Sequence, residues 1–313
     1  MRRLLRRVIQ VLVVLVSADI AYATWSIPER TTLDAAARAG APGKFATLSA
    51  GVTHYEISGP DSGRLAVLVH GFSVPYYIWD STVVALTGAG YRVLRYDLYG
   101  RGYSDRPDVA YSGALFDQQL DDLLDSLHVT TPVDLVGLSF GGFVTAHYAA
   151  GHAARLRTLT FVDPVAGSPA PPSIFRWPVL GLWLWNVTQL PGKAESQTGD
   201  FLHPEHYPGW ADKYRPQVRY KGFGRALLSS ATEASRVPMD TIYGAVAKTG
   251  VPTMLIWGKQ DQTVPFPLSD VVRRAIPAIE FVPVDSAGHL PHIEQSRTVH
   301  ARFLAFLGAH AAK

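Results

Sequence analysis

The sequence contains no cysteine, so the chain can hold neither a disulfide nor a thiolate metal site. It also has little net charge, because 29 basic and 26 acidic residues leave only +3 when histidine is neutral. That balance argues against the basic surface of a nucleic-acid-binding protein. Internal repeats are absent, and 47% of the residues are hydrophobic, which is enough for a buried core. What remains is a globular chain of one large domain or two smaller ones.

Long hydrophobic runs are also missing, apart from one near the N-terminus. Four arginines within the first seven residues precede the apolar stretch from Val8 to Ala18, and the small residues Ala21 and Ala23 follow. This order is typical of an export signal cleaved after residue 23. Cleavage would remove the four arginines and Asp19, which takes the net charge from +3 to zero. We therefore predict a periplasmic or secreted protein with residues 1–23 as its signal peptide.

The alternative is that residues 1–23 stay in place as a membrane anchor. The apolar stretch has about eleven residues, whereas a spanning helix needs roughly 20. Asp19 would also lie inside any extension of that helix. Membrane association through this segment is therefore the second interpretation.

Short apolar segments alternate with segments of helical length along most of the chain. The helical segments include residues 116–127, where leucines recur at helical spacing. This alternation predicts an α/β fold with a mainly parallel, doubly wound sheet, preceded by an antiparallel hairpin over residues 45–58. The expected buried strands are residues 65–70, 91–97, 133–137, 156–163, 251–257 and 279–284.

One interval interrupts the alternation. Residues 164–237 are rich in proline and tryptophan and contain no segment of the strand type. We interpret this interval as an inserted helical cap. The core would then have a first part, residues 24–163, and a second part, residues 238–313.

A serine stands between glycines where a predicted strand meets a predicted helix. The stretch Gly137-Leu138-Ser139-Phe140-Gly141 follows the apolar residues Val133 to Val136 and precedes a helical segment. A strand that turns directly into a helix at such a serine holds the hydroxyl out at a strained tip, and side chains in place of the glycines would collide. We therefore predict that Ser139 is a nucleophile. The alternative is a tight turn without chemistry.

Five motifs in one order resemble the α/β-hydrolase superfamily, of the serine esterase and lipase type that includes monoacylglycerol lipases and carboxylesterases. The resemblance runs from about Phe45 to the C-terminal helix, with the cap as its least similar part. It implies the α/β-hydrolase fold. The motifs are HGFS from His70, DLYGRGYSDRP from Asp97, GLSFGG from Gly137, WGKQDQTVP from Trp257 and GHLPHIE from Gly288.

The resemblance also implies a catalytic triad in the order serine, acid, histidine. Ser139, Asp261 and His289 stand in that order, with His289 as the base that takes the serine proton. Asp163 ends another predicted strand and is the alternative acid; otherwise we expect it to tie down the entrance of the cap. His292 follows a proline and matches no family position, so we expect a surface or supporting role for it.

The family draws two backbone N–H groups to the oxyanion, and here they would come from Phe72 and Phe140. We expect aromatic side chains nearby in sequence or in the cap to line the substrate pocket, although ordinary core packing explains each of them equally well. These aromatic residues are Tyr76, Trp79, Trp183 and Trp185.

A serine nucleophile supports acyl transfer, so the first hypothesis is hydrolysis of a carboxylic ester through an acyl-enzyme. The apolar cap segment favours medium-chain or monoacylglycerol-like esters as the small-molecule substrate. Carbon–carbon bond hydrolysis of ring-fission products is the second hypothesis, and a non-catalytic binding protein with this fold is the third. We expect no cofactor, no nucleic-acid partner and no metal, since His203 and His206 lack further ligands. The sequence leaves the oligomeric state open.

Overall fold

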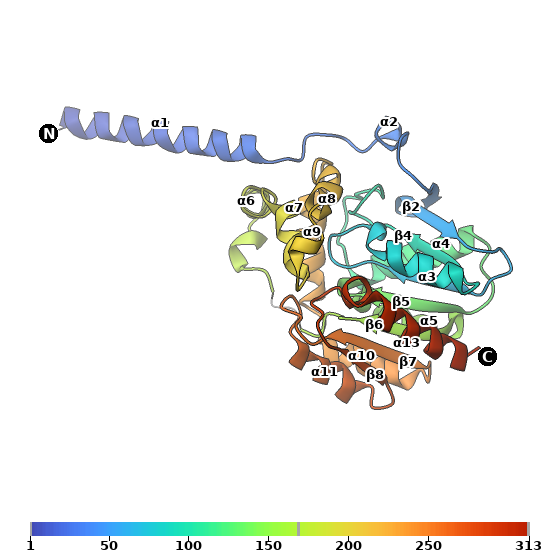
Figure 1. Ribbon diagram of the computed structural model, residues 1–313. Helices are drawn as coiled ribbons and strands as arrows, with labels where there is room; N and C mark the ends of the chain where they lie inside the picture. The colour runs from blue at the N-terminus through green and yellow to red at the C-terminus, as the bar shows by residue number, and fades with distance from the viewer. Residues whose placement is uncertain (1, 168–169, 312–313) are drawn as a thin grey trace.

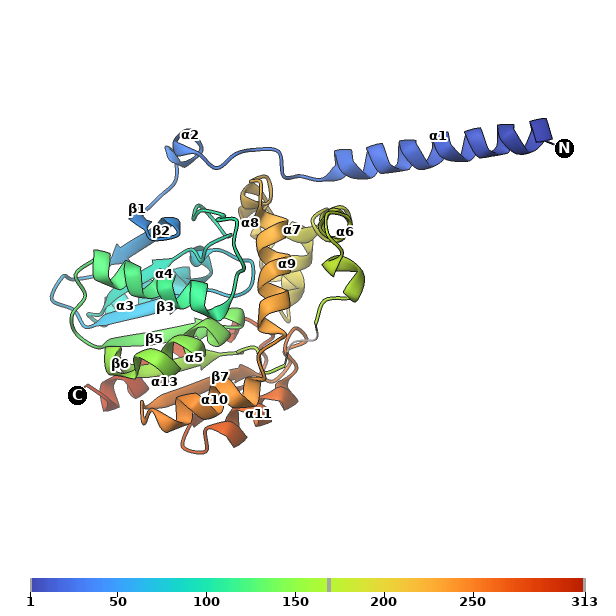
Figure 2. The same ribbon diagram turned by 180° about the vertical axis from the view of Figure 1, so that it is seen from behind.

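The protein is built on one eight-stranded sheet, seen from two sides in Figures 1 and 2. The computed structural model describes residues 2–167 and 170–311. The strands lie in the order β1-β2-β4-β3-β5-β6-β7-β8, antiparallel from β1 to β4 and parallel from there to β8. They are β1 (Lys44–Leu48), β2 (Gly51–Ser58), β3 (Leu65–Val69), β4 (Arg92–Tyr96), β5 (Val133–Leu138), β6 (Leu156–Val162), β7 (Thr253–Gly258) and β8 (Glu280–Val284).

The predicted fold class is confirmed, and the expected strands differ from the observed ones only at their ends. β7 begins at Thr253, two residues later than expected, because Pro252 has no N–H to donate to a neighbouring strand. The carbonyl of Pro252 still accepts a hydrogen bond from Leu159 N, at 2.9 Å. The strands β3, β5 and β7 are buried along their whole length, as expected for the centre of a covered sheet.

Helices cover both faces of the sheet, and each face has its own hydrophobic core. On one face lie α3 (Asp80–Gly88), the short α12 (Pro291–Glu294) and α13 (Ser296–Ala309). On the other lie α4 (Gly113–Ser126), α5 (Phe140–His152), α10 (Met239–Lys248) and α11 (Ser269–Ala275). The helix expected over residues 116–127 begins earlier, at Gly113, because the Ser112 side chain accepts a hydrogen bond from Leu115 N and caps it.

The segment between β6 and β7 is helical and lies at one end of the sheet (Figure 1). In residues 170–237 the structure has helices and 3₁₀ turns and no named strand. The helices are α6 (Leu180–Gln189), α7 (Lys193–Ser196), α8 (Trp210–Val218) and α9 (Phe223–Ala234), and we call them together the cap. The cap stands over the carboxyl ends of the parallel strands, where ligands bind in open α/β sheets.

The N-terminal segment is a single helix, α1 (Arg2–Ser26), which projects away from the body in both views. None of its residues is buried. The helix is longer than the apolar stretch seen in the sequence, and its length and composition suffice to cross a membrane. Beyond α1 and before the small α2 (Ala35–Arg38), the chain runs along the cap, where Thr31 pairs with Tyr220 in an isolated β-bridge.

Candidate active site

Ser139 lies at the turn between β5 and α5, in a backbone conformation that few residues adopt. Its φ is 53° and its ψ is −118°, which is a strained combination for a residue with a side chain. The flanking glycines allow this turn. A Cβ on Gly137 would lie 2.4 Å from Gly141 O, and one on Gly141 would lie 2.4 Å from Val69 O. The turn therefore requires both glycines, as the sequence predicted.

His289 and Asp261 come from loops that follow neighbouring strands, β8 and β7. The Nδ1 atom of His289 lies 2.7 Å from Asp261 Oδ2, and both side chains are buried. The other oxygen of Asp261 accepts hydrogen bonds from the backbone N–H groups of Thr263 and Val264, at 2.8 and 2.9 Å. The carboxylate is thus fixed, and it holds the imidazole with Nε2 as the nitrogen left for chemistry.

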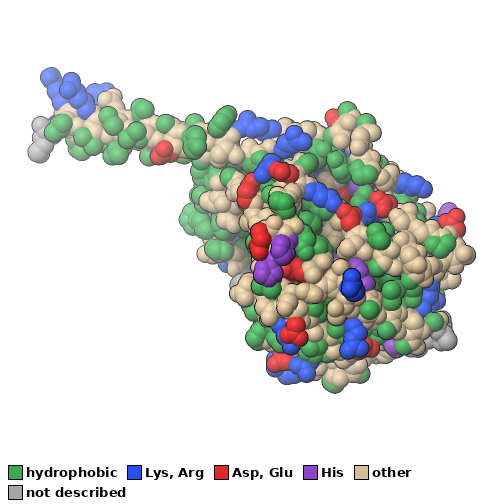
Figure 3. Space-filling view, viewed as in Figure 1, with side chains coloured by type: hydrophobic (Ala, Val, Ile, Leu, Met, Phe, Trp, Pro, Cys, Tyr) green, Lys and Arg blue, Asp and Glu red, His purple; other side chains and the backbone are tan. Residues whose placement is uncertain are grey.

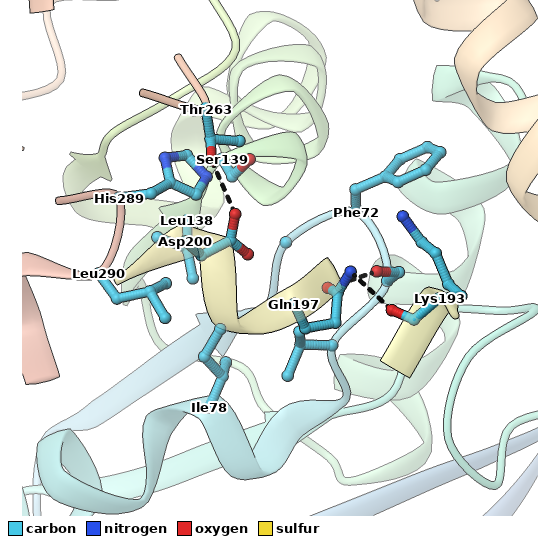
Figure 4. Close-up of a pocket in the computed structure, with 13 residues that line it drawn as sticks. Phe72, Ile78, Leu138, Ser139, Lys193, Gln197, Asp200, Thr263, His289 and Leu290 are labelled. Atoms are coloured by element: carbon cyan, nitrogen blue, oxygen red, sulfur yellow. Dashed lines mark hydrogen bonds between the residues drawn. The ribbon is translucent and has the colours of Figure 1, made fainter. Parts of the chain in front are cut away.

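The imidazole of His289 and the hydroxyl of Ser139 line the same cavity (Figure 4). Among residues 2–167 and 170–311, no hydrogen bond joins Ser139 Oγ to His289. Such bonds are often long without substrate and tighten when it binds. The structure therefore brings Ser139, Asp261 and His289 together at one edge of the sheet.

The surroundings of His289 act on its pKa in opposite directions. Burial by itself lowers the pKa of this imidazole, but the charge of Asp261 and its hydrogen bond outweigh the burial. Asp200 and Glu294 add smaller contributions of the same sign, so that the pKa rises above its ordinary value of 6.5. A base in this position loses its capacity to accept a proton already in mildly acidic solution.

We expect kcat/KM on an ester to fall as the pH drops, with a midpoint above 6.5, because a protonated imidazole cannot take the serine proton. Initial rates across the neutral range measure this midpoint. The matched variant Glu294→Gln removes one of the charges that raise the pKa of His289, without touching the serine or Asp261, and should move the midpoint to lower pH. A parent midpoint below 6.5 would contradict the expectation.

Asp163, the alternative acid, lies directly behind Asp261. One oxygen of its buried carboxyl group accepts a hydrogen bond from Gly258 N at 2.8 Å. Burial raises the pKa of Asp163 well above its usual range, and the neighbouring charge of Asp261 raises it further. We therefore expect Asp163 to carry a proton at neutral pH, which suits a hydrogen-bond donor toward Asp261 and not a charged partner of the histidine.

Ligand atoms of Asp163, Asp261 and His289 all lie within 4.8 Å of one another, which is the arrangement of a three-ligand metal site. The hydrogen bond between His289 Nδ1 and Asp261 already accounts for the close approach of two of these groups. Burial and the neighbouring Asp261 raise the pKa of Asp163, which favours its protonated form and disfavours a role as a charged ligand. A cation would have to compete with protons on these groups, so the residues suit proton transfer better than metal binding.

Phe72 and Phe140, the expected donors of the oxyanion hole, are packed against each other beside Ser139. Phe140 is the first residue of α5, so its N–H has no partner within the helix and lies at the positive end of the helix dipole. The two phenyl rings are arranged edge to face, with their centres 5.7 Å apart. The buried Arg101 holds this loop, because its Nε donates to Phe72 O at 2.8 Å while its guanidinium lies over both rings.

The serine opens into a cavity of about 110 Å³ with two unlike sides (Figure 4). The core side is apolar, and the cap side is polar, with Lys193, Gln197 and Asp200 from α7 and the turn that follows it. Gln197 accepts a hydrogen bond from Ser73 Oγ at 3.0 Å, and Asp200 accepts one from Thr263 Oγ1 at 2.7 Å. The apolar lining residues are Phe72, Val74, Ile78, Leu138 and Leu290.

None of the four aromatic residues expected in the pocket lines this cavity. Tyr76 lines a separate apolar cavity beside α8. The ring of Trp79 packs against the imidazole of His292, with the ring centres 4.7 Å apart. Trp183 donates a hydrogen bond from Nε1 to Thr24 Oγ1 of α1, and the ring centres of Trp185 and Phe175 lie 5.3 Å apart. Trp183 therefore faces α1 and Trp185 packs against the core of the cap, so neither tryptophan forms a wall of the serine cavity as expected.

Of the two roles expected for His292, the surface role is excluded, because the residue is only 1% exposed. Its imidazole is buried, and its Nε2 donates to Ile78 O at 3.1 Å. Burial lowers the pKa of His292 to about 3, so it stays neutral and ties α12 to the loop that carries Ile78.

The polar cap residues Lys193, Gln197 and Asp200 were missed in the sequence. A signal was present, because their spacing of four and three residues places all three on one face of a helix. Burial lowers the pKa of Lys193, and its ammonium group lies 6.0 Å from the centre of the Phe72 ring. A charged group held at the mouth of a small cavity selects for polar or anionic groups on the ligand.

Together these groups can carry out nucleophilic acyl transfer. The strained turn presents a hydroxyl, the buried imidazole can take its proton, and the start of α5 offers N–H groups to an oxyanion. The serine and the N–H of Phe140 come from the turn after β5, and the imidazole comes from the loop after β8, all at the carboxyl edge of the sheet, where ligands bind in open α/β sheets.

Comparisons with known proteins agree with this geometry. The profile described as Alpha/beta hydrolase family matches residues 66–302. Lipase 3 of Moraxella sp. strain TA144 is 23% identical over 78% of both chains. Among solved structures, a thermophilic esterase from Thermogutta terrifontis has a TM-score of 0.72 and 24% identity, over 86% of this chain and 99% of that one. A meta-cleavage product hydrolase from Pseudomonas fluorescens IP01 has a TM-score of 0.70 and 20% identity, over 85% of this chain and 98% of that one.

Proposed function

The chain belongs to the alpha/beta hydrolase family, and from this premise we propose that it is a serine hydrolase that cleaves carboxylic esters through an acyl-enzyme. The observation that supports the proposal most is the strained Ser139 between β5 and α5, in a cavity that also contains His289 with Asp261 behind it. A hydroxyl is a poor nucleophile at neutral pH, and an adjacent base of this kind is what activates it.

The proposed reaction uses these groups in turn. Ser139 Oγ attacks the ester carbonyl while His289 Nε2 takes its proton, and the N–H groups of Phe72 and Phe140 receive the negative charge on the carbonyl oxygen. The tetrahedral intermediate then expels the alcohol, which leaves with the proton from His289. Water attacks the acyl-enzyme with the same histidine as its base, and release of the acid restores the serine.

The two sides of the cavity favour an amphipathic ester. Ile78, Leu138 and Leu290 would contact the acyl part, and Lys193 and Asp200 would bind a polar alcohol part. We therefore propose medium-chain or monoacylglycerol-like esters as the substrate class. The support for this choice is the polar cap side of the cavity, which suits hydroxyl groups, and not the tryptophans of α6.

Carbon–carbon bond hydrolysis is the second candidate. Lys193 favours it, since an ammonium group in the cavity could pair with the carboxylate of a ring-fission product. The similarity to a meta-cleavage product hydrolase is at the level of the fold.

We propose that α1 directs the chain to a membrane, as a cleaved export signal or as a retained anchor. Its 25 residues span about 37 Å at 1.5 Å per residue, which exceeds the roughly 30 Å of a bilayer core. Arg2, Arg3, Arg6 and Arg7 at its start would stay on the cytoplasmic side, so the catalytic body would lie on the other side.

The test of this function compares matched substrates. With p-nitrophenyl and glyceryl esters of the same medium-chain acid, we expect turnover of both and labelling of the protein by a fluorophosphonate. Lys193→Met should lower kcat/KM on the glyceryl ester about tenfold or more, through loss of a charged hydrogen-bond donor, and leave the p-nitrophenyl ester nearly unchanged. Turnover of a dienol diketo acid alone, with inert esters, would establish the second candidate instead, and a protein that neither labels nor turns over would be a binding protein.

A further inference from the structure

The cap carries an exposed apolar surface just before and at the start of α6. Four large side chains there face solvent, and we call them the cap patch: Ile174, Trp177, Val179 and Leu180. Trp177 is 58% exposed and Val179 is 88% exposed. Isolated exposed apolar residues are common, but a group of four within seven residues, including a tryptophan, marks an interaction surface.

The backbone of the cap patch is bent in an unusual way at its most exposed residue. Val179 has a φ of 60° and a ψ of −59°, and Leu180 N donates to Pro178 O at 2.6 Å. This is the rare form of γ-turn, which is strained, and a β-branched residue is a poor choice for it. A strained turn that presents an apolar side chain to solvent needs a role outside packing, because the side chain packs against little of the protein itself.

The cap patch lies beside the base of α1. Trp183 of α6 donates to Thr24 of α1 at 3.0 Å, so the first turn of α6 and the last turns of α1 are in contact. In Figure 1, α1 leaves the body on the side where α6 lies, and Figure 3 shows hydrophobic side chains gathered where the two meet. Anything that surrounds α1 therefore comes close to the cap patch.

The last turns of α1 have the composition of a membrane–water boundary. Tyr22 is 70% exposed and Trp25 is 68% exposed, and such aromatic side chains are enriched at the level of the lipid headgroups. Arg30 lies four residues beyond the end of α1, with its guanidinium 5.9 Å from the centre of the Trp25 ring, and Arg176 lies within the sequence of the cap patch. A cation at the end of α1 and a second one in the cap patch suit the phosphates of lipid headgroups.

We propose that α1 is retained as a membrane anchor and that the cap patch rests on the surface of the bilayer that α1 enters, so that the cap is held at the membrane and the active site beneath it receives esters carried in lipid. The bilayer is the occupant because α1 has no buried residue and is long and apolar enough to cross a membrane, so a bilayer that surrounds α1 would continue onto the cap patch. The part of this inference that concerns the substrate rests on the proposed function. The part that concerns docking rests only on the proposed anchoring by α1 and not on ester hydrolysis, so the two can fail separately.

The absence of native cysteine allows a direct test of docking. In the full-length protein in phosphatidylcholine vesicles, Val179→Cys gives a single thiol for an environment-sensitive dye. The matched control is Val84→Cys on α3, since Val84 is likewise apolar and is 72% exposed. We expect lipids that carry a quencher in the upper acyl chain to quench the dye at position 179 several-fold more than at position 84.

Equal quenching at the two positions would overturn the docking. Protection of the dye at position 179 that depends on protein density and not on the lipid quencher would also overturn it, and would indicate that a second copy of the chain covers the cap patch. Neither readout requires the protein to be an esterase.

Activity tests the part that concerns the substrate. In the double variant Trp177→Ser with Val179→Ser, we expect hydrolysis of a monoacylglycerol embedded in vesicles to fall about tenfold, while hydrolysis of a dissolved short-chain ester stays unchanged. Val84→Ser should leave both rates unchanged. An equal loss on both substrates would mean that the cap patch only maintains the cap, and an unchanged rate on the embedded ester would overturn the role in delivery.

Discussion

Replacing Ser139 with alanine should lower ester turnover by about 10⁵- to 10⁶-fold and abolish covalent labelling by a fluorophosphonate. The reason is chemical, because no other hydroxyl in the cavity stands at the turn between β5 and α5 with the base beside it. The fold should survive, since alanine keeps the Cβ that serine already has in this strained conformation. Labelling and a thermal unfolding curve on the same sample measure both effects.

A matched control separates chemistry from strain. Ser139→Gly should be equally inactive but about 1 kcal/mol more stable than Ser139→Ala, because glycine adopts a φ of 53° without steric cost. If the alanine variant still labels, the nucleophile lies elsewhere. If the glycine variant is no more stable than the alanine variant, the turn is not strained in solution.

The second large effect concerns the acid. Asp261→Asn should lower kcat by about 10³- to 10⁴-fold, because an amide cannot stabilise the imidazolium and favours the wrong tautomer of His289. The hydrogen bonds of Thr263 N and Val264 N to the side-chain oxygen can persist, so the local structure should hold. Single-turnover kinetics would locate the loss in the chemical step.

Asp163→Asn is the control for this substitution, since it replaces a neighbouring carboxyl group of the same size. If Asp163 carries a proton, as its raised pKa indicates, a neutral amide should replace it with a loss of less than about tenfold. The opposite ranking, with Asp163→Asn the more damaging change, would transfer the role of the acid from Asp261 to Asp163.

The sheet could be predicted because its central strands are buried on both faces and read as continuous apolar runs. The residues from Leu65 to Val69 and from Val133 to Leu138 are examples. The turn at Ser139 could also be predicted from the sequence. The backbone around Gly137 and Gly141 leaves no room for a side chain, so only glycine fits at these two positions and the residue type itself indicates the turn.

The cavity could not be predicted, because its lining depends on which way the cap helices face. The tryptophans of α6 are apolar and were expected inward, yet Trp183 lies against α1 and Trp185 against Phe175. The short helix α7 turns polar residues such as Lys193 toward the serine instead. Hydrophobicity alone does not distinguish an inward face from a face that meets another apolar partner.

The pairing of Thr31 with the cap sets the limit to which the chain can be shortened. Arg30 N and Thr31 N both donate to Arg219 O at 2.9 Å, and the carboxylate of Glu29 accepts a hydrogen bond from Gly224 N. The first strand begins at Lys44 and the family match begins at residue 66. A recombinant protein designed to start at either of these boundaries would lack the segment that pairs with the cap. A recombinant protein that starts after Thr31 would lack Glu29, the hydrogen-bond acceptor of Gly224 N in α9. A protein that starts at Thr24 keeps all of these contacts between residues 29–31 and the cap.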